Sequence, residues 1–222
     1  MLLTLEEKVD PANAALLTID VQNDFCNPEA NPAGFSGRDV SMHMKMIDGI
    51  VELVEAARGA GLPIIHVRYE ETPWSMSEVA REQRRRQKAR RAAGHLNFDY
   101  DLCVPGTFGA EFFRIKPQPQ DIIVTKYRYS AFIGTNLDLV LRSLGRRSLV
   151  FCGGGTNICL ESSVRDAYML DYYCVVVGDC SPTPWGLDAY KASLANIDLA
   201  FGQVITLEQA LSVWENQKPS GD

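Results

Sequence analysis

The stretch from residue 148 to residue 167 constrains the fold more than any other part of the chain. An apolar run, Ser148–Cys152, is followed by three glycines, Gly153–Gly155, and then by residues of helical character up to Ala167. A short continuous apolar run that ends in glycines is typical of a strand covered on both faces, as in a parallel sheet. Because glycines allow backbone dihedrals that other residues avoid, the stretch predicts a strand, a tight turn and a helix, which Thr156 or Asn157 caps.

Cys159 lies at the start of this predicted helix. A helix N-terminus presents unpaired N–H groups and a partial positive charge. This environment lowers the pKa of a thiol, and the thiolate is the nucleophilic form of cysteine. The sequence therefore predicts that Cys159 is a reactive cysteine with a depressed pKa.

The rest of the chain alternates strand-like and helix-like segments, without internal repeats or linkers rich in Gly, Ser or Pro. This alternation predicts an α/β protein in which helices cover both faces of a mainly parallel sheet, with residues 1–222 forming a single domain. A surface loop is expected at 25–37 and a frayed tail at 218–222. The other expected strands are Ala14–Val21, Pro63–Tyr69, Asp121–Lys126, Tyr173–Asp179 and Gly202–Thr206, and the other helices are Met42–Ala60, Asn136–Leu144, Leu187–Ala200 and Leu207–Trp214.

Charge and composition exclude several classes of function. The formal net charge of −6 argues against nucleic acid as the main partner. No run approaches the ~20 apolar residues needed to cross a bilayer, and the first residues lack a signal-peptide pattern, so we expect a cytoplasmic protein with no membrane partner. The six cysteines are too sparse for a disulfide framework, and the three histidines have no zinc-ligand spacing.

An arginine-rich segment, Arg81–Arg91, stands out in this acidic chain. The simpler interpretation is a solvated helix or a contact between subunits, because runs of charge usually face water. The alternative is that one or two of these arginines close over an anionic substrate.

Three polar residues follow the apolar cores of predicted strands: Asp20, Lys126 and Cys159. In open α/β sheets, ligands bind at the carboxyl ends of the strands. An ionised group so close to a core is costly unless it is paired, so a meeting of Asp20 and Lys126 over Cys159 would explain both. Taken singly, the Asp could be a loop residue, the Lys could extend its amine to solvent, and the Cys could be inert.

Three motifs give the chain a resemblance to the isochorismatase-like cysteine hydrolase superfamily. They are the segment 20–25 (DVQNDF), the segment 126–132 (KYRYSAF) and the segment 153–167 (GGGTNICLESSVRDA). The resemblance implies a six-stranded sheet in a three-layer α/β/α sandwich and a catalytic triad of Asp20, Lys126 and Cys159. It also implies an oxyanion hole formed by the N–H groups of Gly155 and Cys159, a cis peptide bond at Gly154–Gly155, and a dimer or tetramer.

Within the superfamily, the chain most resembles ureidoacrylate amidohydrolases and related biuret or carbamoyl hydrolases. The resemblance is supported by residues 128–130, 137–138, 141–143, 161–162, 196–197 and 201–202. Nicotinamidases carry a metal cluster after the second strand, where this chain has only His66, inside the strand. We therefore expect no metal and no cofactor. Six residues near the strand ends are candidates for binding a small substrate: Asn23, Arg68, Tyr69, Tyr127, Arg128 and Tyr129.

The expected activity is hydrolysis of a C–N bond in a small ureido, carbamoyl or amide compound, such as ureidoacrylate, biuret or triuret, through a covalent Cys159 intermediate. Alternative substrates are maleamate, a nicotinamide-like amide, an N-carbamoyl amino acid or isochorismate. A non-catalytic nucleotide-binding domain is the alternative from another class. Against it, the glycines at 153–155 do not continue into a G-x-G-x-x-G fingerprint, since Ile158 occupies the sixth position.

Overall fold

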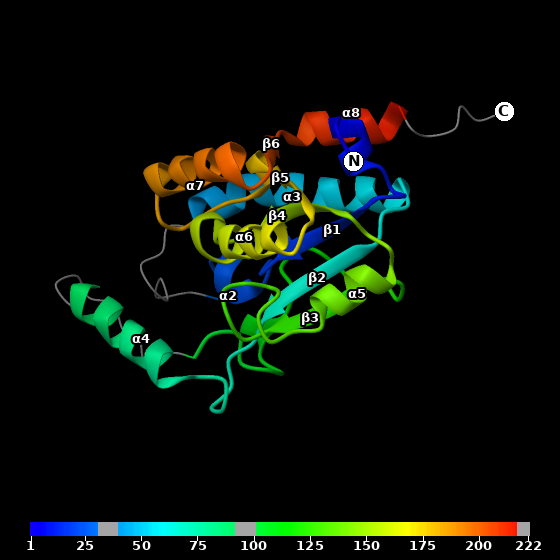
Figure 1. Cartoon of the computed structure of the whole chain (residues 1–222). Coiled ribbons are helices and arrows are strands. Elements are labelled where there is room, and N and C mark those ends of the chain that lie inside the picture. Colours follow the sequence, from blue (N-terminus) through cyan, green and yellow to red (C-terminus); the bar gives the residue numbers. More distant parts are fainter. Residues whose placement is uncertain (31–39, 92–100, 217–222) are drawn as a thin grey trace.

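The computed structural model describes residues 1–30, 40–91 and 101–216, of which the side chains at 87–91 and at 216 are not considered. Six parallel strands form one sheet in the order β3-β2-β1-β4-β5-β6 (Figure 1). The strands are β1 (Ala14–Ile19), β2 (Ile64–Tyr69), β3 (Ile122–Lys126), β4 (Ser148–Gly153), β5 (Tyr173–Val177) and β6 (Gln203–Ile205). The expected mainly parallel six-stranded sheet is confirmed.

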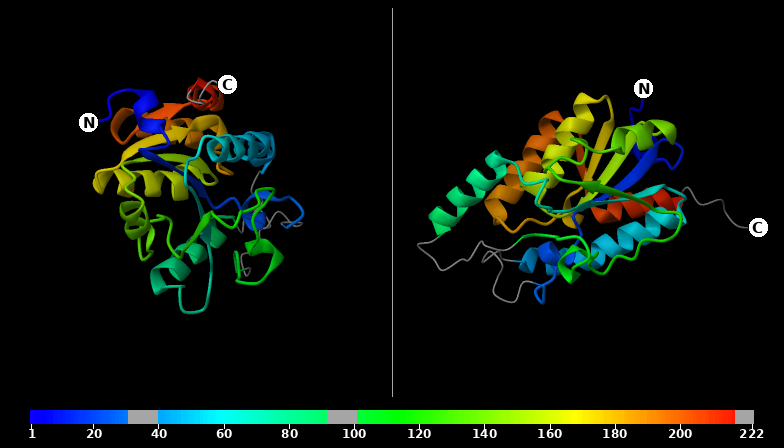
Figure 2. Two further views of the ribbon diagram at one scale, coloured as in Figure 1. Left: turned by 90° about the vertical axis from the view of Figure 1, so that its right-hand side faces the viewer. Right: turned by 90° about the horizontal axis from the view of Figure 1, so that it is seen from below.

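Helices cover both faces of the sheet and give a three-layer α/β/α sandwich, as the resemblance implied (Figures 1 and 2). On one face lie α1 (Leu5–Val9), α3 (Ser41–Gly59) and α8 (Leu207–Asn216), and on the other lie α5 (Leu137–Ser143), α6 (Glu161–Met169) and α7 (Leu187–Ala200). The remaining elements are α2 (Asn23–Cys26), α4 (Glu78–Arg91), η2 (Phe108–Ala110), η3 (Thr156–Leu160) and η4 (Gly178–Cys180).

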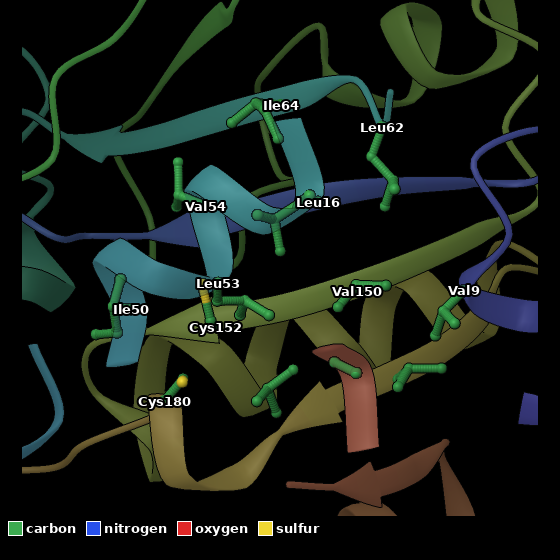
Figure 3. Packing of buried hydrophobic residues seen from close by; sticks show 14 of the residues in the cluster. Val9, Leu16, Ile50, Leu53, Val54, Leu62, Ile64, Val150, Cys152 and Cys180 are labelled. Carbon is green, nitrogen blue, oxygen red and sulfur yellow. The ribbon is translucent and has the colours of Figure 1, made fainter. Parts of the chain in front are cut away.

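The sheet separates two hydrophobic cores, one on each face, and successive residues of a central strand point alternately into one core and the other. In β4, Val150 and Cys152 pack under α3 and α8, whereas Leu149 and Phe151 pack under α5 and α6. Figure 3 shows the first of these cores, with Leu53 of α3 beside Cys152. Because both faces of β4 are buried, its sequence is apolar throughout, which is the pattern that predicted a parallel sheet.

The strand order has a switch point between β1 and β4. From β1 the chain adds β2 and β3 on one side of the sheet, and from β4 it adds β5 and β6 on the other side. Ligands bind at such a point, in the crevice beyond the carboxyl ends of the strands. Asp20 directly follows β1, and the glycine turn directly follows β4. The sheet therefore places two of the three predicted catalytic residues at this crevice.

Most expected elements are confirmed to within two residues, and three details differ. Strand β1 ends at Ile19 because Asp20 has a φ of 51°, which takes the chain out of the extended conformation. The short helix α1 was not expected, although Thr4 and Glu7 form a capping box at its start. The expected loop at 25–37 starts within α2, and its later part and the tail at 218–222 lie outside the described residues.

The arginine-rich segment forms α4, which extends away from the body of the molecule (Figure 1). This position agrees with the simpler interpretation of a solvated helix for the exposed Arg81, Arg85 and Arg86. Arg84 is the exception, since it turns toward the sheet edge and pairs with Glu71. Over the three described ranges, no helix is long and apolar enough to cross a membrane.

Candidate active site

The glycine turn after β4 lies in direct contact with the end of β1. Gly153 has a φ of 107°, and a Cβ atom built on it would lie 2.3 Å from the carbonyl oxygen of Ile19. The N–H of Gly154 donates to the same carbonyl at 2.7 Å. Only glycine fits this close approach. The turn therefore holds the residues after β4 against Asp20, which follows Ile19.

The chain continues from the turn as one π-helical turn, η3, before it becomes the α-helix α6. The N–H of Leu160 donates to the carbonyl of Gly155 at 3.3 Å, five residues back. Such widened turns occur frequently at functional sites. Cys159 lies within η3, so its backbone direction is set by this turn and not by a regular helix.

The expected cap of this helix is wrong. Thr156 donates its hydroxyl to the carbonyls of Ser181 and Pro182, and the side-chain oxygen of Asn157 accepts from Thr183. Both side chains thus fasten η3 to the loop after β5, where buried carbonyls need donors. Gly155, in the left-handed region at a φ of 68°, precedes the turn instead.

Asp20 and Lys126 form a buried ion pair at the carboxyl edge of the sheet. Lys126 Nζ lies 2.8 Å from Asp20 Oδ2, and the two side chains are 0% and 3% exposed. The ammonium also donates to the carbonyl of Arg128 at 3.0 Å and lies over the Tyr69 ring, 5.2 Å from its centroid. Burial acts to lower the pKa of Lys126, but the interactions of the ammonium with Asp20 and Cys159 more than offset this effect and raise the pKa.

Cys159 is half-buried beside this pair, and its pKa differs from the expected one. Burial raises the pKa of the Cys159 thiol to about 12, Lys126 acts to lower it and Asp20 acts to raise it. The expectation of a depressed pKa is therefore wrong, because the desolvation of the thiol outweighs the effect of the lysine. The resting side chain is a neutral thiol, so its reaction as a nucleophile needs a base within reach.

The predicted oxyanion donors belong to backbone segments that lie together. A Cβ atom built on Gly155 would lie 3.6 Å from the backbone nitrogen of Cys159. The expected cis peptide at Gly154–Gly155 is wrong, since the described residues contain no cis peptide bond. The peptide bond is trans, and the chain turns here because Gly155 adopts the left-handed conformation.

A cavity of about 470 Å³ opens above these residues. Asp20, Gly154, Gly155 and Cys159 line its floor, while the loop before α4, the first turns of α4 and the segment after β3 form its outer wall. The cavity lining includes four of the six predicted substrate-binding residues, namely Tyr69, Tyr127, Arg128 and Tyr129.

The other two candidates do not line the cavity. Asn23 donates its side-chain amide to the carbonyl of Phe108 at 2.8 Å and so holds the segment 108–111 against α2. Arg68 donates to Thr125 Oγ1 at 3.0 Å and pairs with Glu70 at 2.9 Å. Both side chains are engaged by neighbouring parts of the protein.

Other cavity residues were not predicted. Phe25, His43 and Trp185 line the cavity from α2, from α3 and from the loop after η4. A positional signal existed for two of them, because His43 lies in the first turn of a helix that follows β1 and Trp185 follows β5. In a parallel α/β sheet, helix N-termini and the loops after strands share one edge. Their residue types alone gave no such signal.

A metal site is not formed by the described part of the chain, where no three His, Cys, Asp or Glu side chains are grouped so that they could hold an ion. His66 lies in the middle of β2, 0% exposed, between Thr18 and Asp121. The chemistry that these residues offer is that of a thiol, a carboxylate and an ammonium side by side.

Comparison with known proteins identifies the family. Residues 14–209 match the isochorismatase domain. The chain is 33% identical to the ureidoacrylate amidohydrolase RutB of Methylobacterium radiotolerans, over 96% of this chain and 84% of that protein, and 34% identical to RutB of Caulobacter segnis, over 89% and 84%. A cysteine hydrolase from Pseudomonas syringae pv. phaseolicola superposes with a TM-score of 0.77 at 25% identity, covering 94% of this chain and 95% of that one. The chain belongs to the isochorismatase family of hydrolases.

Proposed function

We propose that this enzyme, an amidohydrolase of the isochorismatase family, cleaves a C–N bond of a small ureido, carbamoyl or amide substrate through a covalent intermediate on Cys159. The observation that carries the proposal is the buried Asp20–Lys126 ion pair, because its Asp20 lines the same cavity as Cys159. The relatives named ureidoacrylate amidohydrolase support a ureido group as the substrate's reacting part.

In the first step, Sγ of Cys159 attacks the carbonyl carbon of the substrate and passes its proton to the carboxylate of Asp20. A base is required because the thiol, with a pKa of about 12, is protonated at neutral pH. Lys126 Nζ lies 2.8 Å from Asp20 Oδ2, so a positive charge stands beside the carboxylate that accepts this proton. The positive charge of Lys126 also stabilises the sulfur as the proton leaves.

The negative charge that develops on the substrate oxygen is stabilised by the N–H groups of Gly155 and Cys159. In comparable sites each such donor contributes roughly 3 kcal/mol to the transition state. Collapse of the tetrahedral intermediate breaks the C–N bond, and Asp20 returns its proton to the departing nitrogen. The products of this half-reaction are an amine or ammonia and a thioester or S-carbamoyl enzyme.

In the second step, a water molecule attacks the acyl carbon and gives a proton to Asp20. The C–S bond breaks, the carboxylic or carbamic acid leaves, and the proton returns to Sγ. Asp20 thus acts as base and acid in each half-reaction, which suits a single carboxylate held at the centre of the site.

Ammonia release tests the proposal with ureidoacrylate, biuret, triuret, N-carbamoyl amino acids, maleamate and nicotinamide. Cys159→Ala should lower turnover on the order of 10⁴-fold or more, because it removes the nucleophile. Cys174→Ala, which removes a buried thiol outside the cavity, is the matched control and should keep most of the activity.

Near-normal turnover by Cys159→Ala would overturn the covalent mechanism. Failure of the wild-type enzyme to hydrolyse any ureido or carbamoyl compound would overturn the substrate assignment. Hydrolysis of maleamate or nicotinamide alone would move the reaction to simple amides and leave the role of Cys159 intact.

A further inference from the structure

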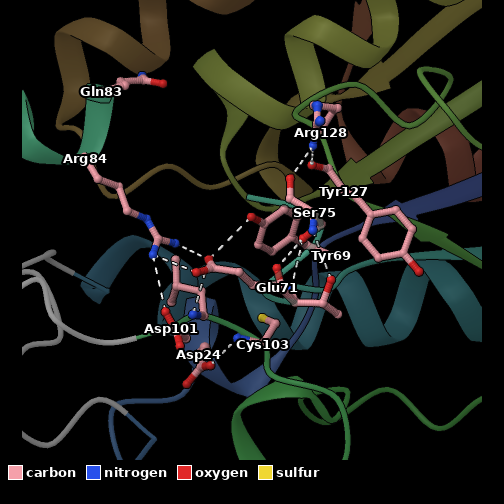
Figure 4. A network of polar contacts seen from close by, with 12 residues as sticks. Asp24, Tyr69, Glu71, Ser75, Gln83, Arg84, Asp101, Cys103, Tyr127 and Arg128 are labelled. Atoms are coloured by element: carbon pink, nitrogen blue, oxygen red, sulfur yellow. Dashed lines mark hydrogen bonds and ion pairs between the residues drawn. The ribbon is translucent and has the colours of Figure 1, made fainter. Parts of the chain in front are cut away.

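Three arginines lie near the cavity edge, and they differ in their partners. Arg68 pairs with Glu70 and Arg84 pairs with Glu71. Arg128 contacts no carboxylate in the described ranges. Figure 4 shows Arg84 and Arg128 on opposite sides of Tyr69. Arg84 and Arg128 line the cavity, whereas Arg68 does not.

Arg84 is already neutralised by a buried carboxylate. Its NH1 donates to Glu71 Oε1 at 2.7 Å, its NH2 donates to Glu71 Oε2, and its NH1 lies 3.8 Å from Asp101. Glu71 is 2% exposed, so the pair is held away from water. A further carboxylate beside Arg84 would be repelled by Glu71 and Asp101. Arg84 is therefore a wall residue and a poor site for an anion.

Arg128 is held in place by backbone carbonyls alone. Its NH1 donates to the carbonyl of Ser75 at 2.9 Å and to its neighbour Tyr127 at 2.7 Å. These bonds use both hydrogens of NH1, while Nε and NH2 meet no acceptor within the described part of the chain. The free Nε–NH2 edge has the geometry that binds a carboxylate through two parallel hydrogen bonds.

The backbone of Arg128 lies next to the proposed catalytic residues. Its carbonyl accepts from Lys126 at 3.0 Å on the cavity floor, while its guanidinium reaches the Ser75 carbonyl on the outer wall. Close to Arg128 in the sequence and on the same wall, the Tyr127 ring packs against Trp74, with centroids 4.6 Å apart. The exposed side chain of Arg128 thus holds a positive charge at the cavity wall, where two backbone carbonyls fix its guanidinium.

We propose that Arg128 binds a carboxylate at the end of the substrate remote from the bond that is cleaved. The substrate is then a ureido, carbamoyl or amide acid and not an uncharged compound such as biuret. This inference rests on the proposed function for the reaction, and it assigns the anion contact to the segment after β3 and not to the arginine-rich helix α4.

The test compares 3-ureidopropionate with its uncharged methyl ester by ammonia release. Arg128→Gln should lower kcat/KM for the acid about 10- to 100-fold, mainly through KM, and leave the ester nearly unchanged. Arg128→Lys should recover part of the loss, because it restores the charge without the two-pronged geometry. Arg81→Gln is the matched control, since Arg81 is an exposed arginine of α4 that bonds to the carbonyl of Pro73 outside the cavity lining.

An unchanged acid-to-ester ratio in Arg128→Gln would overturn the inference. An equal loss for both substrates would also overturn it, since Arg128 would then act through its contacts with Lys126 and Ser75. Calorimetric binding to Cys159→Ala separates this inference from the proposed function, because it needs no turnover. A preference for the acid that disappears with Arg128→Gln supports the carboxylate contact even if no ureido compound is hydrolysed, and equal binding of acid and ester contradicts it.

Discussion

Two clusters of buried titratable side chains lie on the same sheet, and only one of them reaches the cavity, through Asp20. The first is Asp20 with Lys126 at the carboxyl ends of β1 and β3. The second joins His66 of β2 to Asp121, just before β3, with Nε2 and Oδ2 3.2 Å apart. Arg58 of α3 pairs with the same Asp121 at 2.6 Å.

The second cluster has residue types that usually suggest catalysis. Thr18 Oγ1 lies 2.9 Å from His66 Nδ1, so a hydroxyl, an imidazole and a carboxylate stand in a row. None of these residues lines the cavity, and the Phe112 ring covers His66 at a centroid distance of 5.4 Å. The comparison shows that residue types alone do not identify a catalytic site. Access to a cavity distinguishes a cluster that can react with a substrate from one that stabilises the fold.

The largest effect is expected from Lys126→Met. The change leaves the carboxylate of Asp20 buried without its counter-charge, which costs about 3–5 kcal/mol in the free energy of unfolding. Turnover should fall at the same time, because the positive charge that stabilises the sulfur as its proton leaves is removed. Urea unfolding and ammonia release measure the two losses.

The double variant Asp20→Asn with Lys126→Met is the control for this prediction. It removes both charges and should recover part of the lost stability while turnover stays low. A single variant with unchanged unfolding free energy would contradict the buried ion pair, and recovered turnover in the double variant would contradict the role of Asp20.

A smaller effect is expected from Asp121→Asn in the second cluster. The loss of charge weakens the bonds to Arg58 and His66 and should lower the free energy of unfolding by about 1–3 kcal/mol. Because Asp121 does not line the cavity, kcat/KM should stay within about twofold of the wild type. A fall in turnover as large as that of Lys126→Met would erase the distinction between the two clusters.

The sequence predicted the first cluster well and missed the second. Asp20, Lys126 and Cys159 each follow an apolar strand, and parallel strands bring such positions to one edge, so their meeting followed from pattern and topology. His66 and Asp121 are 55 residues apart and pair through the register of β2 with β3, where Ile65 lies opposite Ile122. Register is a property of the folded sheet and cannot be read from either strand alone.

Local chemistry at the site was harder to predict than the placement of residues. The pKa of Cys159 depends on its burial, which requires the positions of the cavity walls. The conformation at Gly154–Gly155 depends on how closely Gly153 approaches Ile19. The neutralisation of Arg84 depends on Glu71, on a separate segment 13 residues earlier. Each of these features arises from tertiary contacts that leave no periodic signal in the sequence.

The smallest effect is expected from pH, through His66 of the second cluster. Burial lowers the pKa of His66, although Asp121 opposes this effect, so the folded protein binds the proton less well than the unfolded chain. The free energy of unfolding should therefore fall as pH drops below about 6.5, the ordinary range of histidine. Asp121, whose pKa is lowered by Arg58 and by the N–H of Gln118 despite its burial, contributes only below about 3.9. Urea unfolding at pH 7.5 and 5.5 measures the change, and His66→Gln should show a smaller difference between the two. An equal difference in the variant and the wild type would assign the pH dependence to other groups and contradict a buried neutral His66.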